Sequence, residues 1–406
     1  MNNRIKVFST KQPKIGEVSG FVKPGFERVR QAFIENFTRR KELGGACCIY
    51  LRGEKVVDLW GGVRNEAAAE PWEEDTLVIV FSTTKGLAAI AIALLHSRGL
   101  LNYDEKVAAY WPEFAQAGKA NITVRQLLSH QAGLCAINEP ITMAVLSDPE
   151  ALAKVLARQE PAWEPGTRQG YHAISIGFYE SELVRRVDSH HRRLGHFFRE
   201  EIAAPLGLDF YIGLPDEIDE ACLATIKMFQ PAAMPFHLSE VPIAYAFALM
   251  NKNSLTTRAL FKNPGLGIPF DAQRIYTRGI EFPAMGGIGS ARSIAHAYGA
   301  MLTGELGITQ ETLRALSAPA IPPRDGFHDQ VLKVNWCLSL GFAKPGLSLK
   351  FGQDGSAFGT PGLGGSFGFA DPANQVGYAY VTNQMGFSQG NDRRDVALRS
   401  AFYSCL

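Results

Sequence analysis

The spacing of apolar residues changes from a helical to a strand-like period near the start of the chain. Apolar side chains recur at three- and four-residue steps in residues 26–37, which predicts an amphipathic helix that ends near Gly44. Two strand-like runs follow, at 46–51 and 55–60, and the short segment 52–54 between them is suited to a turn. The pattern therefore predicts a helix followed by a β-hairpin.

The middle of the chain has few strand signals. A strand-like run at 76–81 leads into a strongly apolar helix that begins near Ser82 and fades by Gly99. Residues 106–280 then carry mostly helical spacing. Strand-like runs return near the end, before a closing helix at about 392–403, and they cover residues 334–342, 365–370 and 375–382.

Sheet-forming ends around a helical middle predict two domains in one chain. We expect an α/β domain built from residues 23–105 and 281–406, with a mostly helical domain of residues 106–280 inserted into it. The stretch near 212–270 is dense in Phe, Met, Pro and Ala, so it either lines an apolar cleft as a lid-like segment or forms core. The core interpretation is favoured.

Composition removes several classes of function. The 406 residues are 46% apolar and 20% charged, and 41 Lys and Arg against 40 Asp and Glu give a net charge of +1. This balance gives no general attraction to nucleic acid or to an anionic membrane, and no local patch stands out, so neither partner is expected. The six cysteines lack metal-ligand spacing and the N-terminus has no apolar stretch of signal-peptide length, so we expect reduced thiols and a cytoplasmic protein.

The first candidate nucleophile is Ser366, in a Gly-x-Ser-x-Gly motif at residues 364–368. A hydrolase that uses this motif needs an acid and then a histidine later in the chain, but the last histidine is His328. A glycine-rich turn between two strands explains the same residues without catalysis. We therefore interpret this motif as structural.

The second candidate is Ser82, which forms a Ser-x-x-Lys motif with Lys85. The Ser82 hydroxyl is expected at the N-terminus of the apolar helix, where unpaired N–H groups favour negative charge. Residues three apart share a helix face, so the Lys85 amine is expected beside the Ser82 oxygen. Desolvation by the apolar residues that follow would lower the pKa of this amine and allow it to act as a base. Taken alone, the motif is better explained by a helix-capping serine and a solvated lysine.

Two further segments favour catalysis. Tyr171 follows the turn at Pro165-Gly166 and precedes a helical segment, and its phenol can take part if a cation such as Lys85 lies close to it. Residues 358–372 are rich in glycine and lead into a strand, so a substrate could approach this backbone closely.

With these three segments in this order, the chain resembles the serine β-lactamase and penicillin-binding-protein superfamily. It is most similar to the class C-like branch that contains family VIII carboxylesterases and β-lactamase-related proteins. The resemblance runs from about Phe26 to the C-terminus, and residues 58–62, 122–134 and 200–208 also support it. It implies a β-lactamase/transpeptidase-like α/β fold, with an antiparallel sheet flanked by helices and a helical insertion domain.

The resemblance also implies roles for particular residues. Ser82 would be the acylated nucleophile and Lys85 its activating amine, while Tyr171 would pass a proton to the leaving group and later activate water. The oxyanion hole would be formed by the backbone N–H groups of Ser82 and Leu363. This chemistry needs no cofactor and no metal.

The chain departs from class C β-lactamases at two positions that bind substrate. Their Tyr-x-Asn motif ends here in Ala173, and their late motif begins with Lys where this chain has Thr360, followed by Pro361 and Gly362. Without these anchors, selection for β-lactams and peptide carboxylates is weakened. Thr360, Pro361 and Gly362 are still expected to contact the substrate.

Four other residues are candidates for secondary roles. Arg292 or Arg324 could restore a cationic anchor from a distance, which keeps lactam cleavage open as an alternative. His172 neighbours the catalytic tyrosine and could tune the site or bind substrate, whereas His130 is expected to make structural hydrogen bonds.

The sequence therefore predicts a serine hydrolase that acts through an acyl-enzyme on a small-molecule ester with a short acyl chain. The alternatives are a β-lactamase or D-amino-acid peptidase and, from a different class, a non-catalytic scaffold. A homo-oligomer is possible.

Overall fold

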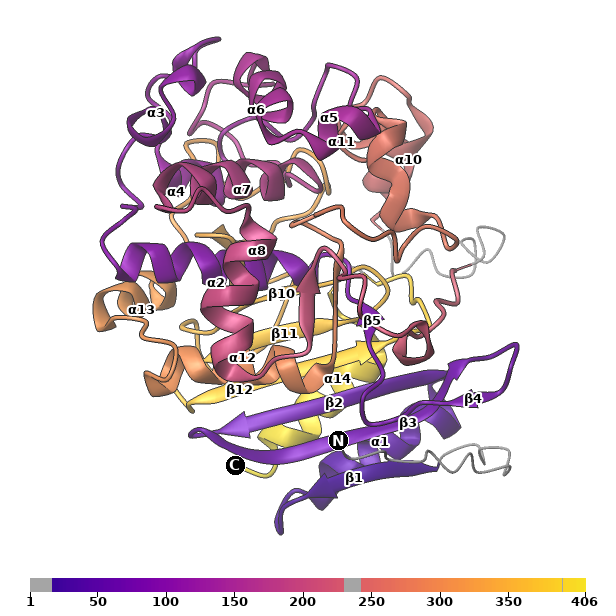
Figure 1. Cartoon of the computed structure of the whole chain (residues 1–406). Coiled ribbons are helices and arrows are strands. Elements are labelled where there is room, and N and C mark those ends of the chain that lie inside the picture. Colours follow the sequence, from indigo (N-terminus) through magenta and orange to yellow (C-terminus); the bar gives the residue numbers. More distant parts are fainter. Residues whose placement is uncertain (1–16, 230–241, 389) are drawn as a thin grey trace.

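The computed structural model describes residues 17–229, 242–388 and 390–406, and its centre is an antiparallel sheet with helices on both faces (Figure 1). The strand order is β1-β3-β2-β12-β11-β10-β9-β8, and β4 pairs with β3. The strands are β1 (Val18–Val22), β2 (Gly44–Leu51), β3 (Glu54–Asn65), β4 (Glu70–Pro71), β8 (Leu338–Ser339), β9 (Phe342–Ala343), β10 (Phe358–Pro361), β11 (Phe367–Asp371) and β12 (Val376–Thr382).

Neighbouring residues of β12 show which helices cover each face of this sheet. The Tyr378 hydroxyl donates a hydrogen bond to Asp395 on α14 (Arg393–Tyr403), which packs with α1 (Glu27–Arg39). The preceding residue, Gly377, lies against the backbone of α12 (Ala291–Thr303). Successive strand residues point to opposite faces, so α1 and α14 cover one face of the sheet and α12 covers the other.

The mostly helical residues 106–280 contribute one strand, β6, to the small sheet β5-β7-β6, and the other two strands come from the chain on either side of this range. The strands of this sheet are β5 (Val78–Ile79), β6 (Phe210–Ile212) and β7 (Gly287–Gly289). The remaining helices are α2 (Thr83–Ser97), α3 (Val107–Tyr110), α4 (Val124–Leu128), α5 (Met143–Ser147), α6 (Pro149–Arg158), α7 (Ser175–Val187), α8 (Leu194–Phe198), α9 (Ala204–Leu206), α10 (Ile243–Met250), α11 (Leu255–Phe261) and α13 (Gln310–Ser317). The 3₁₀ helices are η1 (Pro112–Ala115), η3 (Glu220–Cys222) and η5 (Pro264–Phe270), and η2 (Arg199–Ala203) is a π-helix.

The first predicted hairpin is present as β2 and β3. Arg52 and Gly53 connect these strands and both have positive φ, +53° and +79°, as a tight hairpin turn requires. The predicted strand at 334–342 is wrong as a single element. Leu340 and Gly341 also have positive φ, so the run folds back on itself as the two short strands β8 and β9.

Both ends of the chain contribute to one sheet, because β12 pairs along its length with β2. Residues 106–280 are mostly helical, but the domain boundaries at 105/106 and 280/281 stay predictions. In the described ranges, no helix is both long enough and apolar enough to cross a bilayer.

The helix that carries the Ser-x-x-Lys motif is buried on every side. All residues of α2 from Thr83 to Leu95 are buried, and the helix packs against α7, β10 and β11. This surrounding core fixes the N-terminus of α2 relative to the sheet and to the helical part.

Candidate active site

Ser82 lies where a strained turn meets the buried helix. Shortly after β5, Phe81 adopts a φ of +47°, a left-handed conformation that is costly for a bulky side chain. Ser82 follows as the N-cap of α2, but its side chain makes no capping hydrogen bond to the helix. The helix-capping alternative therefore does not describe this serine, and its hydroxyl is available to other partners.

Lys85 is buried one helical turn after Ser82. Its amine donates a hydrogen bond to Ser82 Oγ at 3.2 Å. It also donates to the backbone oxygens of Ala173 at 2.7 Å and Ala284 at 2.8 Å, so none of its hydrogen-bond partners is charged. Burial lowers the pKa of Lys85 to about 7. A large share of this amine is therefore neutral at physiological pH and can accept a proton.

Tyr171 completes the group that the sequence predicts. The Lys85 amine lies 4.8 Å from the centre of its ring. Burial raises the pKa of Tyr171, and a hydrogen bond with Ser82 offsets part of this rise, so the phenol keeps its proton at neutral pH. The backbone N–H of Tyr171 donates to Oδ1 of the buried Asp329 at 3.1 Å, which fixes the tyrosine from behind. The structure thus brings Ser82, Lys85 and Tyr171 together.

An apolar cavity of about 300 Å³ opens beside Ser82 and Tyr171. Among the described residues its lining contains no Lys, Arg, His, Asp or Glu. The segment 230–241 lies outside the described residues, but other parts of the stretch near 212–270 form much of the wall, so the cleft interpretation fits better than the core interpretation. The remaining lining residues are Ala173, Met228, Phe229, Tyr245, Leu249, Leu260, Phe261, Phe270, Met285, Leu332, Trp336, Pro361, Gly362, Leu363, Gly386, Phe387 and Gly390.

A glycine allows the turn after β10 to approach the start of α2. A Cβ added at Gly362 would collide with Val80 O and would lie 2.8 Å from Thr83 Oγ1. The Gly362 N–H donates to Ser366 O at 2.7 Å, which closes the turn, and the buried Ser366 hydroxyl donates to Val80 O. Leu363, the next residue, therefore lines the cavity close to the N-terminus of α2.

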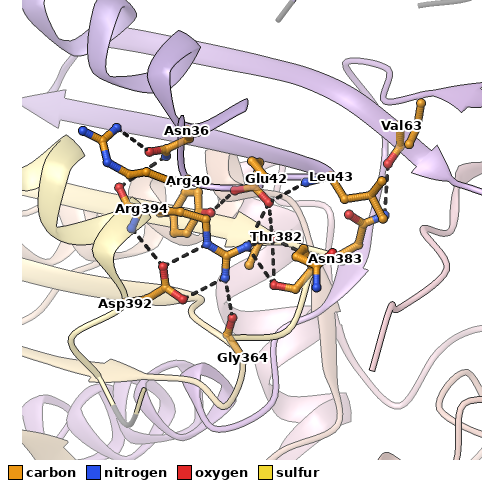
Figure 2. Close-up of polar contacts among 12 residues, drawn as sticks. Asn36, Arg40, Glu42, Leu43, Val63, Gly364, Thr382, Asn383, Asp392 and Arg394 are labelled. Atoms are coloured by element: carbon orange, nitrogen blue, oxygen red, sulfur yellow. Dashed lines mark hydrogen bonds and ion pairs between the residues drawn. The ribbon is translucent and has the colours of Figure 1, made fainter. Parts of the chain in front are cut away.

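A buried ion-pair network holds the other side of this turn (Figure 2). Arg394 Nη2 donates to Gly364 O at 3.0 Å and to Asp392 Oδ2 at 2.7 Å. Arg394 Nη1 donates to Glu42 Oε1 at 3.0 Å. This arginine therefore connects the residue after Leu363 to the N-terminal and C-terminal parts of the chain.

Comparison with known proteins identifies the family of this chain. The family model described as Beta-lactamase matches residues 29–401. The chain belongs to the beta-lactamase family. This confirms the resemblance and the fold class that the sequence predicts.

Three members of the beta-lactamase family or its structural relatives are informative. "Esterase/beta-lactamase LipL" of Mycobacterium tuberculosis is 36% identical over 290 residues, which cover 71% of this chain but only 65% of that protein. The crystal structure of a family VIII carboxylesterase is 37% identical, with a TM-score of 0.82 over 96% of this chain and 100% of that chain. A penicillin-binding-protein homolog from Caulobacter crescentus is 34% identical, with a TM-score of 0.79 over 96% of this chain and 100% of that one.

Two histidines near the site make structural hydrogen bonds in this beta-lactamase-family chain. His172 is fully buried, its Nε2 accepts from Leu134 N at 3.0 Å, and its Nδ1 lies 2.7 Å from Gly170 O. The His172 backbone N–H in turn donates to His130 Nδ1 at 2.9 Å. His172 is not among the cavity-lining residues, so its position does not fit the expected contact with substrate, whereas His130 has the structural contact expected of it.

The three positions at the end of β10 that were expected to contact substrate divide into two groups. Pro361 and Gly362 line the cavity, but Thr360 is buried on the other side of β10, where a Cβ on Gly86 of α2 would lie 3.1 Å from its hydroxyl. The two arginines considered as distant anchors also lie elsewhere. Arg292 pairs with Asp58 and Glu74, and the exposed Arg324 pairs with Glu164 and Asp325.

Sequence analysis missed a buried carboxyl group behind the site. Glu180 on α7 is fully buried, and neither of its carboxyl oxygens has a hydrogen-bond partner among the described residues. A Cβ on Gly341 would lie 3.5 Å from Glu180 Oε1 and would collide with Ala89, one turn beyond Lys85 on α2. Burial raises the pKa of Glu180 to about 8, and the charge of Lys85 offsets part of this rise. No local motif marks this residue, since its surroundings come from helix packing.

Proposed function

We propose that this chain is a serine carboxylesterase that hydrolyses neutral, apolar esters with short acyl chains through an acyl-enzyme on Ser82. The observation that carries the proposal is an uncharged apolar cavity beside a serine whose hydroxyl accepts a hydrogen bond from a desolvated lysine. The esterase named among its relatives and the family VIII carboxylesterase that matches nearly the whole chain support the same activity.

In the proposed acylation step, Lys85 acts as the base. Its amine, with a pKa of about 7, takes the proton from Ser82 Oγ as this oxygen attacks the ester carbonyl carbon. Tyr171 still carries its proton, because burial keeps its pKa high. The phenol gives that proton to the leaving alkoxide as the carbon–oxygen bond breaks, and the Lys85 ammonium then reprotonates it.

Deacylation reverses these proton transfers with water as the nucleophile. The water loses a proton to the Lys85 and Tyr171 pair, its oxygen attacks the acyl carbon, and Ser82 leaves with a proton. In both steps the negative oxygen of the tetrahedral intermediate would be held by the N–H groups of Ser82 and Leu363. The close approach of Gly362 to Val80 and Thr83 supports this assignment, because it brings the second N–H to the N-terminus of α2.

The lining of the cavity favours esters over substrates with a carboxylate. A carboxylate without a cationic partner is strongly disfavoured in an apolar site. Neither Ala173 nor Thr360 supplies the polar anchors of class C β-lactamases, and Arg292 and Arg324 are engaged in ion pairs elsewhere. A neutral ester pays only a small desolvation free energy when it enters such a cavity.

Covalent labelling tests whether Ser82 is the nucleophile. We expect a fluorophosphonate probe to label the wild-type chain and the Ser366→Ala variant, which lacks the other candidate serine. The Ser82→Ala variant should not be labelled. Equal labelling of Ser82→Ala and wild type would overturn the proposal and support the scaffold alternative.

Parallel assays test the class of substrate. We expect p-nitrophenyl butyrate to be hydrolysed with a much higher kcat/KM than a chromogenic cephalosporin. Faster turnover of the cephalosporin would favour the β-lactamase alternative and would contradict the role assigned to the uncharged cavity lining.

A further inference from the structure

Helix α10 has apolar side chains on two opposite faces. On its inner face, Tyr245 and Leu249 line the cavity. On its outer face, Ile243, Phe247 and Met250 are 66%, 69% and 81% exposed. Their spacing of four and three residues places these three side chains on one side of the helix. Such a group of large exposed apolar side chains is unusual on a protein surface that binds nothing.

On the neighbouring helix α11, an exposed aromatic side chain also lines the cavity. Helix α11 packs beside α10 at the outer edge of the helical part (Figure 1). At the end of α11, Phe261 lines the cavity and is also 55% exposed. Phe261 therefore joins the protein surface near these helices to the cavity beside Ser82.

The segment that forms α10 and α11 carries cations but no acidic residue. Residues 242–263 include Lys252, Arg258 and Lys262 and contain no Asp or Glu. Lys252 and Lys262 are exposed, and the amine of Lys262 and the guanidinium of Arg258 donate hydrogen bonds to the neutral Asn138. The carboxylate next to this asparagine, Glu139, is already paired with Arg158 at 2.6 Å. Residues 242–263 therefore carry a net positive charge, although the whole chain is nearly neutral.

We propose that α10 and α11 dock on a lipid–water surface that carries anionic headgroups. Ile243, Phe247 and Met250 enter the apolar layer, and Lys252 and Lys262 contact the headgroups. The purpose of this docking rests on the proposed function, because it would deliver esters dissolved in the lipid to the cavity. This inference departs from the sequence-based expectation that no membrane partner exists, since the patch forms only when the two helices fold together.

A second copy of this chain fits the same surface less well. In a symmetric dimer, each partner presents the same patch to the other. The lysines beside the apolar face would then approach the lysines of the second copy, and like charges across an interface disfavour association. An anionic lipid surface has no such conflict.

The binding experiment uses the Ser82→Ala variant of the full chain, so that no hydrolysis changes the lipid. Its partition coefficient is measured by co-sedimentation with vesicles of phosphatidylcholine alone and with vesicles that also contain phosphatidylglycerol. We expect tighter binding to the anionic vesicles. Adding Phe247→Ser should lower the partition coefficient about tenfold, because burial of a phenyl group is lost. Adding Lys252→Gln and Lys262→Gln should remove the preference for phosphatidylglycerol.

Leu100→Ser is the matched control. Leu100 is 45% exposed and follows the far end of α2, about 22 Å along the helix from Ser82. This substitution should leave vesicle binding unchanged. Equal losses for Phe247→Ser and Leu100→Ser, or no binding to either kind of vesicle, would overturn the proposal. Size-exclusion chromatography that shows a Phe247-dependent dimer without vesicle binding would assign the face to a second copy instead.

The docking and the esterase activity can fail separately. With Ser82 intact, Phe247→Ser should hydrolyse dissolved p-nitrophenyl butyrate at the wild-type rate, because Phe247 does not line the cavity. Vesicle binding without hydrolysis of any ester would sink the proposed function but not the docking. Hydrolysis of the dissolved ester without vesicle binding would overturn the docking but not the proposed function.

Discussion

Lys85 and Arg394 are both buried cations, and a comparison of their surroundings separates a reactive group from a structural one. Lys85 donates hydrogen bonds only to a hydroxyl and to two backbone oxygens, and burial lowers its pKa to about 7. Burial by itself would lower the pKa of Arg394 as well. The carboxylates of Glu42 and Asp392 outweigh this effect and hold the pKa of Arg394 well above its usual range. A buried basic group that is paired with carboxylates thus stays protonated. A buried basic group without such partners can lose and regain a proton.

Burial without a carboxylate does not by itself make a lysine catalytic. The amine of Lys119 donates hydrogen bonds to three backbone oxygens, and that of Lys344 donates to two. Burial lowers the pKa of each to about 8. Neither lines the cavity. Of these three lysines, Lys85 alone combines a lowered pKa with a serine hydroxyl and a space for substrate, so the other two serve as controls.

The largest effect is expected at Lys85. Lys85→Met removes the proposed base while it keeps an unbranched apolar side chain, so kcat/KM for p-nitrophenyl butyrate should fall about 10³-fold. The control Lys119→Met should change this value less than twofold, even if it destabilises the fold. Steady-state kinetics on both variants, with circular dichroism to confirm folding, decide the point. A similar fall in kcat/KM for Lys85→Met and Lys119→Met would mean that the loss of activity comes from removing a buried lysine and not from removing the amine beside Ser82.

Removal of Arg394 should affect folding more than chemistry. Arg394→Met leaves Glu42 and Asp392 buried without their cation, so the free energy of unfolding should fall by about 3–5 kcal/mol. Urea unfolding measures this change. Arg39→Met is the control, because Arg39 is 72% exposed in its pair with Glu35 and such surface pairs contribute about 0–1 kcal/mol. Equal stabilities of the two variants would refute a structural role for the network in Figure 2.

Gly362→Ala tests the turn that connects the two regions. The added methyl group collides with Val80 O and Ser366 Oγ, so the turn must move and shift the N–H of Leu363. Loss of one oxyanion-hole donor should lower kcat about 10²-fold, with a smaller change in KM. Gly355→Ala, where a methyl group meets nothing within 4 Å, should behave as wild type. A kcat within twofold of wild type for Gly362→Ala would exclude Leu363 from the oxyanion hole.

The smallest effect is expected at Glu180. Because Lys85 must be neutral to act as a base, kcat/KM should rise with pH through about 7. Burial raises the pKa of Glu180 to about 8, so this carboxyl is only partly ionised near pH 7. Its ionised fraction raises the pKa of Lys85, so Glu180→Gln should move the rise in kcat/KM slightly to lower pH. The other titratable groups around Lys85 do not interfere, since burial keeps His130 and His172 neutral and keeps Tyr171 protonated.

Glu182→Gln is the control for this pH profile. Glu182 lies on the same helix but pairs with Arg185 and Arg186. Its substitution should leave the midpoint of the profile unchanged. An unchanged midpoint for Glu180→Gln as well would show that Glu180 has no electrostatic effect on the base.

Local sequence patterns were sufficient where the signal lies within one element. The start of α2, the helix face shared by Ser82 and Lys85, and the hairpin of β2 and β3 all follow from short-range spacing and turn chemistry. Placing Tyr171 beside them needed the resemblance to a known family, because 85 residues lie between Lys85 and Tyr171 in the chain. Spacing alone does not predict such a contact.

Other features depend on burial that no local pattern reveals. Helix α12 and the mostly exposed strand β1 were not predicted, and β1 lacks an apolar run that would have marked it. The roles of Glu180 and Arg394 likewise arise from packing between distant elements. His172 was considered for substrate contact because it adjoins Tyr171, but its ring is turned into the core.

The most direct test of the account is to find the acyl group. The enzyme is mixed with p-nitrophenyl butyrate, quenched in acid within the first turnovers, digested with trypsin and examined by tandem mass spectrometry. We predict one butyryl group on Ser82, in the tryptic peptide that ends at Lys85, and none in the Lys85→Met variant. A butyryl group on another residue, or turnover by wild type with no acylated peptide in repeated rapid quenches, would contradict the central claim.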